Sequence, residues 1–158
     1  MQKITPFLWF DSQAEEAATV YVSLFDDAEI TGISRYPEDA PGPTDEVMTV
    51  SFRLADQEFT ALNGGPQFSF TEAVSFAVAC EDQEEVDRLW DALIEGGGEP
   101  SQCGWLKDRF GLSWQIVPTR LHELLDDPDP ARAQRAIQAM LQMGKIEIKG
   151  LEDAADAA

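Results

Sequence analysis

Residues 72–98, EAVSFAVACEDQEEVDRLWDALIEGGG, change abruptly from one hydrophobic period to another. The first nine residues alternate in a way that is typical of a β-strand. Asp82 and Glu85 then form the acidic start of a helix, and an apolar stripe at helical spacing follows, consisting of Val86, Leu89, Trp90, Leu93 and Ile94. The glycines at 96–98 are interpreted as a helix end and a turn. The stretch therefore predicts one strand followed by one amphipathic helix.

The N-terminal part of the chain repeats this pattern. Residues 3–10, KITPFLWF, predict a strand, and residues 11–25 predict a helix whose capping box is formed by Ser12 and Glu15. The expected buried stripe of this helix comprises Ala14, Ala17, Ala18, Tyr21, Leu24 and Phe25. The two predicted caps, at positions 12 and 82, are 70 residues apart. This spacing indicates an internal duplication.

Short strands follow each predicted helix. In the first half they cover residues 29–36, 47–54 and 57–63, and in the second half they cover the region of 99–102, 104–110 and 112–118. An acidic, proline-rich segment at 37–46 predicts a loop within the first half. The expected fold class is α+β, with two βαβββ modules that form curved mixed sheets and a helix covering one face of each sheet.

We expect one domain over residues 1–158, divided into module one (1–65), module two (66–118) and a C-terminal helical extension (119–158). In the extension, residues 119–127 and 129–143 predict helices. The segment after the second of these helices is left open between a short edge strand and a frayed helix.

The second predicted helix of the extension has clear boundary signals. Asp129 is its expected cap, Pro130 lies in its first turn, and Gly144 is its expected end. Its expected packing face, against the sheets or against a partner subunit, comprises Ala133, Ile137, Met140 and Leu141.

Composition excludes several classes of function. The net charge is −19, from 30 acidic and 11 basic residues, whereas a nucleic-acid surface concentrates Lys and Arg. No run approaches the ~20 apolar residues needed to span a bilayer, and Asp11 comes too early for a signal peptide. Two cysteines do not make a disulfide framework. We therefore expect an acidic, soluble, cytoplasmic protein that binds neither nucleic acid nor membrane.

The doubled βαβββ pattern resembles the vicinal oxygen chelate superfamily, which includes glyoxalase I, bleomycin-resistance proteins and extradiol dioxygenases. Within it, the motifs LNGGP (62–66), FTEAVSF (70–76) and QCGWLKDRFGLSWQIVP (102–118) are similar to the PhnB-like branch, often labelled 3-demethylubiquinone-9 3-methyltransferase. The resemblance is expected to run over nearly the whole chain, including residues 136–148. It implies a homodimer that uses sheet edges or the C-terminal helices.

The resemblance also identifies the positions where the superfamily carries metal ligands. These positions are occupied here by Thr5, Asn63, Ser75 and Gln115, all of which are neutral. A divalent transition metal prefers imidazole, thiolate or carboxylate ligands. We therefore expect no metal at the usual place and no cofactor.

Strand alternation selects the ligand contacts that we expect. If Leu8, Phe10, Trp114 and Ile116 lie under the helices, their neighbours along the strands face the cup of the sheets. These neighbours are Phe7, Trp9, Ser113 and Gln115. An aromatic lining with a few polar groups is typical of a small-molecule site. The predicted contacts are Phe7, Trp9, Asn63, Trp105, Lys107 and Gln115.

Two interpretations remain open for several of these residues. Trp105 and Lys107 either pack across strands or offer a stacking surface and a cation to an anionic or aromatic ligand. Asn63 either contacts the ligand or serves the turn. Cys103 is a weak candidate for a nucleophile because it lacks an evident base. His122, the only histidine, is expected to be exposed, and Cys80 is expected in the core.

The hypothesis that follows is a protein of the glyoxalase/bleomycin-resistance type that binds a small organic molecule of unknown identity without the usual metal site. Whether it is also an enzyme is left open. One alternative is a metal-dependent lyase or isomerase of the glyoxalase type. Another is a methyltransferase, as the family label suggests, but no glycine-rich strand-to-helix turn is present to hold its cofactor.

Overall fold

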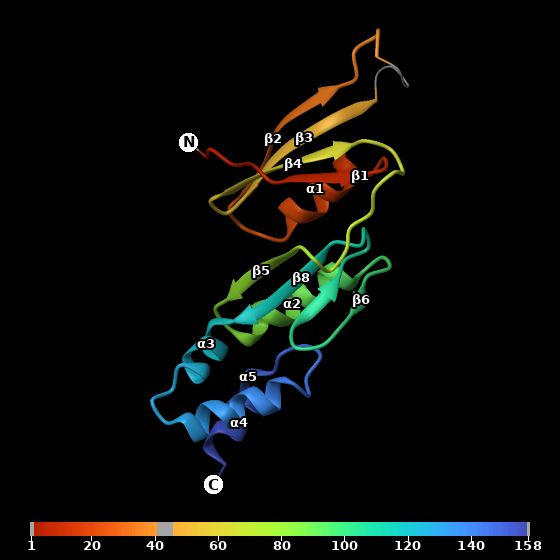
Figure 1. Ribbon diagram of the computed structural model, residues 1–158. Coiled ribbons are helices and arrows are strands. Elements are labelled where there is room, and N and C mark those ends of the chain that lie inside the picture. The colour runs from red at the N-terminus through yellow and green to blue at the C-terminus, as the bar shows by residue number, and fades with distance from the viewer. Residues whose placement is uncertain (1, 41–45, 158) are drawn as a thin grey trace. The chain divides into compact units, whose positions relative to one another are not determined.

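The computed structural model describes residues 2–40 and 46–157, and the chain divides into two compact units, 1–69 and 70–158 (Figure 1). Unit one contains β1 (Phe7–Phe10), α1 (Ala14–Ser23), β2 (Ala28–Arg35), β3 (Val47–Leu54) and β4 (Gln57–Asn63). Unit two repeats this order with β5 (Ser75–Cys80), α2 (Gln83–Ile94), β6 (Glu99–Pro100), β7 (Trp105–Lys107) and β8 (Ser113–Pro118). The predicted α+β class with two βαβββ modules is confirmed. The loop predicted over 37–46 falls partly outside the described residues.

The sheet of unit one has the strand order β1-β4-β3-β2, in which only β1 and β4 run parallel. Leu8 and Phe10 are buried, whereas Phe7, on the other face of the same strand, is 62% exposed. The predicted stripe of α1 is buried at Ala14, Ala17, Ala18, Tyr21 and Leu24. Alternation along β1 therefore gives one face to the core under α1 and leaves the other open, as expected.

The start of α1 differs from the prediction. Gln13 is the residue before the helix and no side chain of the capping box caps it, so the box predicted at Ser12 and Glu15 is wrong. Instead, the Oδ1 atom of Asn63 accepts a hydrogen bond of 2.8 Å from the Ala14 N–H. Because Phe10 pairs with Asn63 in the parallel register, the end of β4 lies beside the helix start. A distant residue thus satisfies the first helical N–H.

The sheet of unit two has the corresponding order β5-β8-β7-β6, with β5 and β8 parallel. Its helix begins as predicted, because the Asp82 side chain accepts a 2.9 Å hydrogen bond from the Glu85 N–H. The α2 residues Val86, Leu89, Trp90 and Leu93 are buried, as are Leu106, Trp114 and Ile116 of the sheet. The core of this unit therefore lies between α2 and one face of the sheet.

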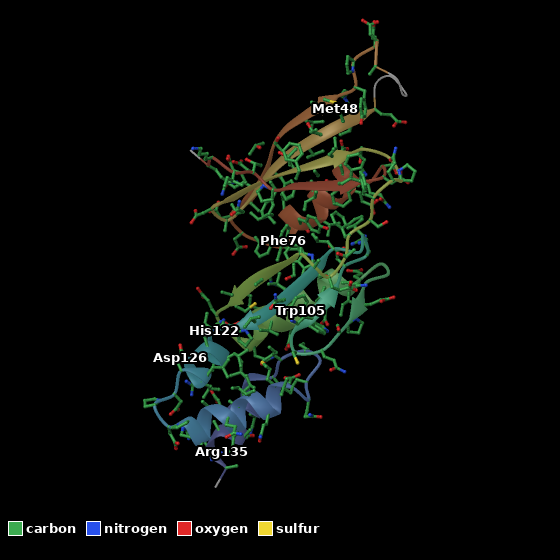
Figure 2. All side chains as sticks on the ribbon, viewed as in Figure 1. Met48, Phe76, Trp105, His122, Asp126 and Arg135 are labelled. Atoms are coloured by element: carbon green, nitrogen blue, oxygen red, sulfur yellow. The ribbon has the colours of Figure 1, made fainter. Side chains whose placement is uncertain are left out.

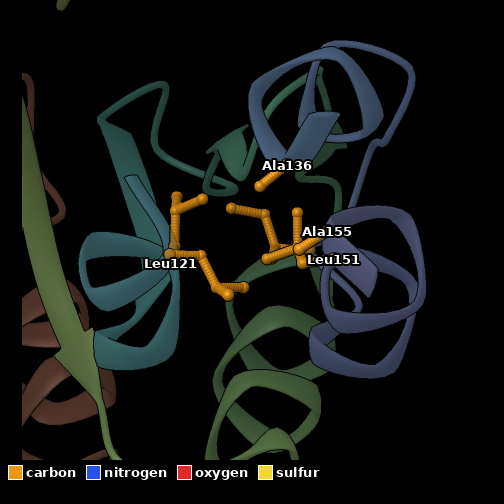
Figure 3. Close-up of a cluster of buried hydrophobic side chains, with 6 residues drawn as sticks. Leu121, Ala136, Leu151 and Ala155 are labelled. Carbon is orange, nitrogen blue, oxygen red and sulfur yellow. The ribbon is translucent and has the colours of Figure 1, made fainter. Parts of the chain in front are cut away.

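Three helices complete unit two: α3 (Thr119–Leu125), α4 (Pro130–Met140) and α5 (Ile148–Asp156). The segment left open between strand and helix is thus helical. The three helices share a small core of their own (Figure 3), which consists of Leu121, Leu124, Ala136, Ile146, Leu151 and Ala155. None of the helices within 2–40 and 46–157 is long and apolar enough to cross a bilayer.

The boundaries and the packing face of α4 were predicted in part. Asp129 caps the helix by accepting from the Ala131 N–H, as expected, but the helix ends at Met140, before Gly144. Its fully buried residue is Ala136, which was not predicted, and Met140 of the predicted face packs against the same core. Ile137 and Leu141 are 38% and 51% exposed, and contact of this face with a partner subunit stays a prediction. The small Ala136 allows a close approach to Leu151 and Ala155 of α5, which the larger side chains would prevent.

Candidate functional site

The open face of the second sheet brings three of the predicted contacts together. The register places Trp105 opposite Gln115 and Lys107 opposite Ser113, and Ser75 pairs with Ser113 from the other side. Because side chains alternate along a strand, all five residues share the face that points away from α2. Figure 2 labels Trp105 on this sheet. The predicted grouping of Trp105, Lys107 and Gln115 on one face is therefore what the strand pairing produces.

A pocket of about 260 Å³ opens on this face, within unit two. Its walls come from β6, β7 and β8 and from the segment before β5, and they comprise Glu72, Glu99, Pro100, Ser101, Trp105, Leu106, Lys107 and Ser113. Small-molecule sites combine apolar and aromatic surface with a few placed polar groups. This lining has that character, with one indole ring, two hydroxyl groups and three charged side chains.

The Lys107 ammonium is not an unpaired cation. It forms an ion pair with the Glu72 carboxylate, which comes from the segment before β5. The hydrogen bond from Lys107 lowers the pKa of Glu72, and the same bond raises the pKa of Lys107. Both side chains therefore stay charged around neutral pH, and each neutralises the other locally.

Ser113 is the unusual residue of the pocket. It is 1% exposed, and its Oγ atom is the buried side-chain oxygen or nitrogen that lacks a hydrogen-bond partner in the described part of the chain. A buried hydroxyl without a partner costs free energy, roughly 1–3 kcal/mol. Such a group in a pocket wall is what a ligand's polar atom would satisfy.

The four positions where the superfamily carries metal ligands hold neutral side chains here, and three of the four make hydrogen bonds within the protein. The Nε2 atom of Gln115 donates to the Ser75 Oγ at 2.9 Å, so these two side chains satisfy each other. Asn63 uses both ends of its amide, because its Nδ2 atom also donates to the Val47 carbonyl at 3.0 Å. Thr5 is exposed in the segment before β1.

The donor chemistry of the four positions is that of neutral amides and hydroxyls. Within residues 2–40 and 46–157, no three His, Cys, Asp or Glu side chains gather as metal ligands would. Neutral amides and hydroxyls supply no charge to offset the desolvation of a dication. The residues at these positions therefore do not fit a transition metal.

The predicted contacts of unit one lie on the open face of the first sheet or at its end. Trp9 is held in place, because its indole N–H donates to the Gly65 carbonyl at 2.9 Å and its ring meets Phe68 edge-on, with centroids 4.9 Å apart. A side chain at Gly64 would collide with the Trp9 ring. Phe7, Trp9 and Asn63 belong to unit one, whereas Trp105, Lys107 and Gln115 belong to unit two.

The structure shows where the two cysteines and the single histidine lie. Cys103 lies in the turn before β7 with a positive φ of 58°, and its N–H donates to the Met143 carbonyl at 2.8 Å. His122 is exposed on α3, as expected (Figure 2). Cys80 is fully buried, and desolvation raises the pKa of its thiol to about 12, which confirms its place in the core.

The profile of the family described as 3-demethylubiquinone-9 3-methyltransferase matches residues 2–117. The chain belongs to this family. A PhnB protein from Bacillus cereus is 40% identical, with 74% of this chain and 99% of that chain covered and a TM-score of 0.68. The predicted membership of the PhnB-like branch of the vicinal oxygen chelate superfamily is confirmed.

Two further solved structures are similar to the present chain. A Pseudomonas aeruginosa protein has 24% identity and a TM-score of 0.58, with 75% of this chain and 98% of that chain covered. A glyoxalase/bleomycin resistance protein from Albidiferax ferrireducens has 15% identity and a TM-score of 0.48, with 74% and 98% covered. No curated protein matches the chain. The family match ends at residue 117, so the expectation that it extends over 136–148 is wrong.

Sequence reasoning missed part of the pocket lining. Glu72 was predicted only as part of the strand that begins the second module, and Glu99 only as part of a strand near residues 99–102. Ser113 was assigned to the correct face by alternation, but its missing hydrogen bond depends on its neighbours. Pairing of Glu99 with Lys107 across a two-residue strand has no sequence signal strong enough to predict it.

Proposed function

We propose that this protein binds a small organic molecule in the pocket on the open face of its second sheet, without a resident transition metal. The observation that carries the proposal is the Ser113 hydroxyl, which is buried in the pocket wall without a partner. Folding leaves this group unsatisfied, and a bound polar atom would complete its hydrogen bonding.

The other lining groups support the same function. The Trp105 ring supplies stacking surface, and Lys107 with its partner Glu72 supplies oriented charge. Gln115 lies on the same face but is bonded to Ser75, so its proposed role is to hold the sheet surface. Phe7 and Trp9 stay predictions as ligand contacts, because the pocket is formed by unit two.

The alternative functions make different predictions. A lyase or isomerase of the glyoxalase type needs a divalent ion, which the residues at the four superfamily positions do not favour. A methyltransferase, as the family description suggests, predicts saturable binding of S-adenosylmethionine. The glycines at 64–65 are followed by a loop, and the glycines at 96–98 are followed by the two-residue strand β6. Neither segment leads into the N-terminus of a helix, as a glycine-rich cofactor-binding turn would.

The proposal is tested by a thermal-shift screen of a metabolite library with and without EDTA. We expect at least one compound to raise the melting temperature equally in both conditions. The Trp105→Ala variant should bind that compound roughly 2–10-fold more weakly. Leu141→Ala, at an exposed apolar residue directly after α4, is the control and should bind normally.

Two outcomes would contradict the proposal: stabilisation that disappears with EDTA, or a screen in which no compound shifts the melting temperature. Titration calorimetry with S-adenosylmethionine examines the methyltransferase alternative. Native mass spectrometry on the same sample measures the subunit number, since the homodimer implied by the family stays a prediction, as does the cytoplasmic location.

A further inference from the structure

The charges around the pocket are unbalanced. Two carboxylates, Glu72 and Glu99, and one ammonium, Lys107, line it. Lys107 is paired with Glu72, and Glu99 lies opposite Lys107 in the β6–β7 register. The pocket therefore carries one excess negative charge. The whole chain carries −19, so its long-range field also attracts cations and repels anions.

An anionic ligand would meet two obstacles in this pocket. It would have to displace Glu72 from Lys107 to reach the ammonium, and it would then lie near Glu99. A cationic ligand meets neither obstacle, because it can pair with a carboxylate while the Lys107–Glu72 pair stays intact. Glu72 and Glu99 thus make Lys107 a poor anchor for an anionic ligand.

The neutral part of the lining suits the same ligand. The face of an indole ring attracts a cation placed over it, and Trp105 lines this pocket. The buried Ser113 hydroxyl can donate to an oxygen or accept from an N–H, and it has no partner among the described residues that would compete. A ligand that combines an ammonium group with an oxygen would use both features.

The wall beside Trp105 is held in position before any ligand binds. The Cys103 N–H donates to the Met143 carbonyl at 2.8 Å, and the Gly104 N–H donates to the Gly144 carbonyl at 2.9 Å. The Ser101 N–H donates to the Trp105 carbonyl at 2.9 Å. Residues 143–144 lie beyond the family match, so the C-terminal extension braces this wall. A braced wall lowers the entropic cost of binding.

We infer that the pocket selects a small organic cation, an amine that also carries a hydrogen-bonding oxygen, with Glu99 and Trp105 holding the ammonium group and Ser113 bonding the oxygen. The inference rests on the proposed function, since it names the ligand class of the same pocket. It assigns Ser113 as a specificity residue of this chain.

Four probes of one carbon skeleton test the charge and the oxygen separately. Phenethylamine, phenethyl alcohol and phenylacetate differ only in carrying an ammonium, a hydroxyl or a carboxylate, and phenylethanolamine adds a hydroxyl to the amine. In calorimetric titrations of the full chain at low ionic strength, the amine should bind about 10-fold more tightly than phenylacetate. The added hydroxyl should tighten binding by a further factor of roughly 2–10.

Two variants assign these effects to residues. Glu99→Gln should reduce the preference for phenethylamine over phenethyl alcohol, whereas Glu95→Gln, at an exposed residue after α2, should keep it. Ser113→Ala should abolish the advantage of phenylethanolamine over phenethylamine and leave the affinity for phenethylamine unchanged. The unliganded Ser113→Ala variant should melt no lower than the parent protein, because the change removes an unsatisfied buried hydroxyl.

The results separate this inference from the proposed function. If phenylacetate binds as tightly as phenethylamine, or if Glu99→Gln keeps the ranking, the cation inference is overturned while the pocket remains a binding site. If none of the four probes binds but a library compound binds in a Trp105-dependent way, the ligand class is again wrong and the function stands. If no compound of any charge binds, both fail.

Discussion

The side-chain oxygen of Asn63 accepts a 2.8 Å hydrogen bond from the backbone N–H of Ala14, 49 residues earlier in the chain. The same amide donates to the Val47 carbonyl, so one side chain joins the end of β4 to the start of α1 and the start of β3. The Tyr36 hydroxyl donates to the backbone carbonyl of Asn63. This position, where we considered a ligand contact, is therefore a structural junction of unit one.

Replacing Asn63 should destabilise the protein without affecting the pocket of unit two. Asn63→Ala removes the cap of α1 and leaves the Val47 carbonyl without this donor, so we expect a loss of about 1–3 kcal/mol in the free energy of unfolding. Asn63→Asp keeps the acceptor for the Ala14 N–H and should lose less. Urea denaturation of the two variants measures the difference, and equal losses would contradict the assigned cap.

The two helix starts should respond differently to equivalent changes. Asp82 caps α2, so Asp82→Ala should cost about 1 kcal/mol of stability. Ser12→Ala should cost almost nothing, because no side chain of the predicted capping box caps α1. Thermal and urea unfolding of both variants provide the measurement. If Ser12→Ala lost as much stability as Asp82→Ala, Ser12 would have to cap α1 after all, which would contradict the structure.

The ion pair between Lys145 and Asp87 should give a pH-dependent stability. Its atoms are 2.8 Å apart, and it joins the segment before α5 to α2. The hydrogen bond from Lys145 lowers the pKa of Asp87, and the hydrogen bond to Asp87 raises the pKa of Lys145. A lowered carboxyl pKa contributes stability above its ordinary value, about 4, and loses it as the pH falls through the lowered value.

For Lys145 the sign is opposite, because a raised ammonium pKa contributes stability below its ordinary value, about 10.4, and loses it as the pH rises further. Lys145→Gln should therefore be less stable than the parent by up to about 1 kcal/mol between roughly pH 5 and 9. The difference should vanish in strong acid. Lys149→Gln, which breaks an exposed pair with Asp153, is the control and should show a smaller difference. A Lys145→Gln difference that persists in strong acid would contradict the assignment.

The two cysteines should differ in reactivity. Cys80 is fully buried with its thiol pKa raised to about 12, so it should not react with a thiol reagent in the folded protein at neutral pH. Cys103 is partly exposed and free, so it should react. Titration with a chromogenic disulfide reagent should therefore find one thiol in the native protein and both after denaturation. The Cys103→Ser variant should show no native reaction.

Local patterns predicted the elements well because they depend on residues near in sequence. Alternation identified both faces of β1 and β8, and helical spacing identified the buried stripes of α1 and α2, since each pattern reports which side chains can share a face. For α4 the same reasoning identified Met140, which packs on the core of the three helices, but not the buried Ala136. There the buried side is chosen by how closely Ala136 can approach α5, and the apolar pattern of the helix does not show this.

The candidate site was predicted only in part for a related reason. Trp105, Lys107 and Gln115 were grouped correctly because strand register carries them to one face. The ion pair of Lys107 with Glu72 and the bond of Gln115 to Ser75 depend on segments that meet only after folding. Those contacts decide which polar groups are satisfied and which remain available to a ligand.

The amino-acid sequence by itself determined the duplicated strand and helix order, the buried faces and the acidic character, because hydrophobic period and charge are properties of the chain alone. Only the tertiary structure decided that Asn63 caps a helix, that Lys107 is neutralised and that the Ser113 hydroxyl has no partner in the described chain. Hydrogen bonds and ion pairs act over a few ångströms, so they depend on which distant residues the fold brings together.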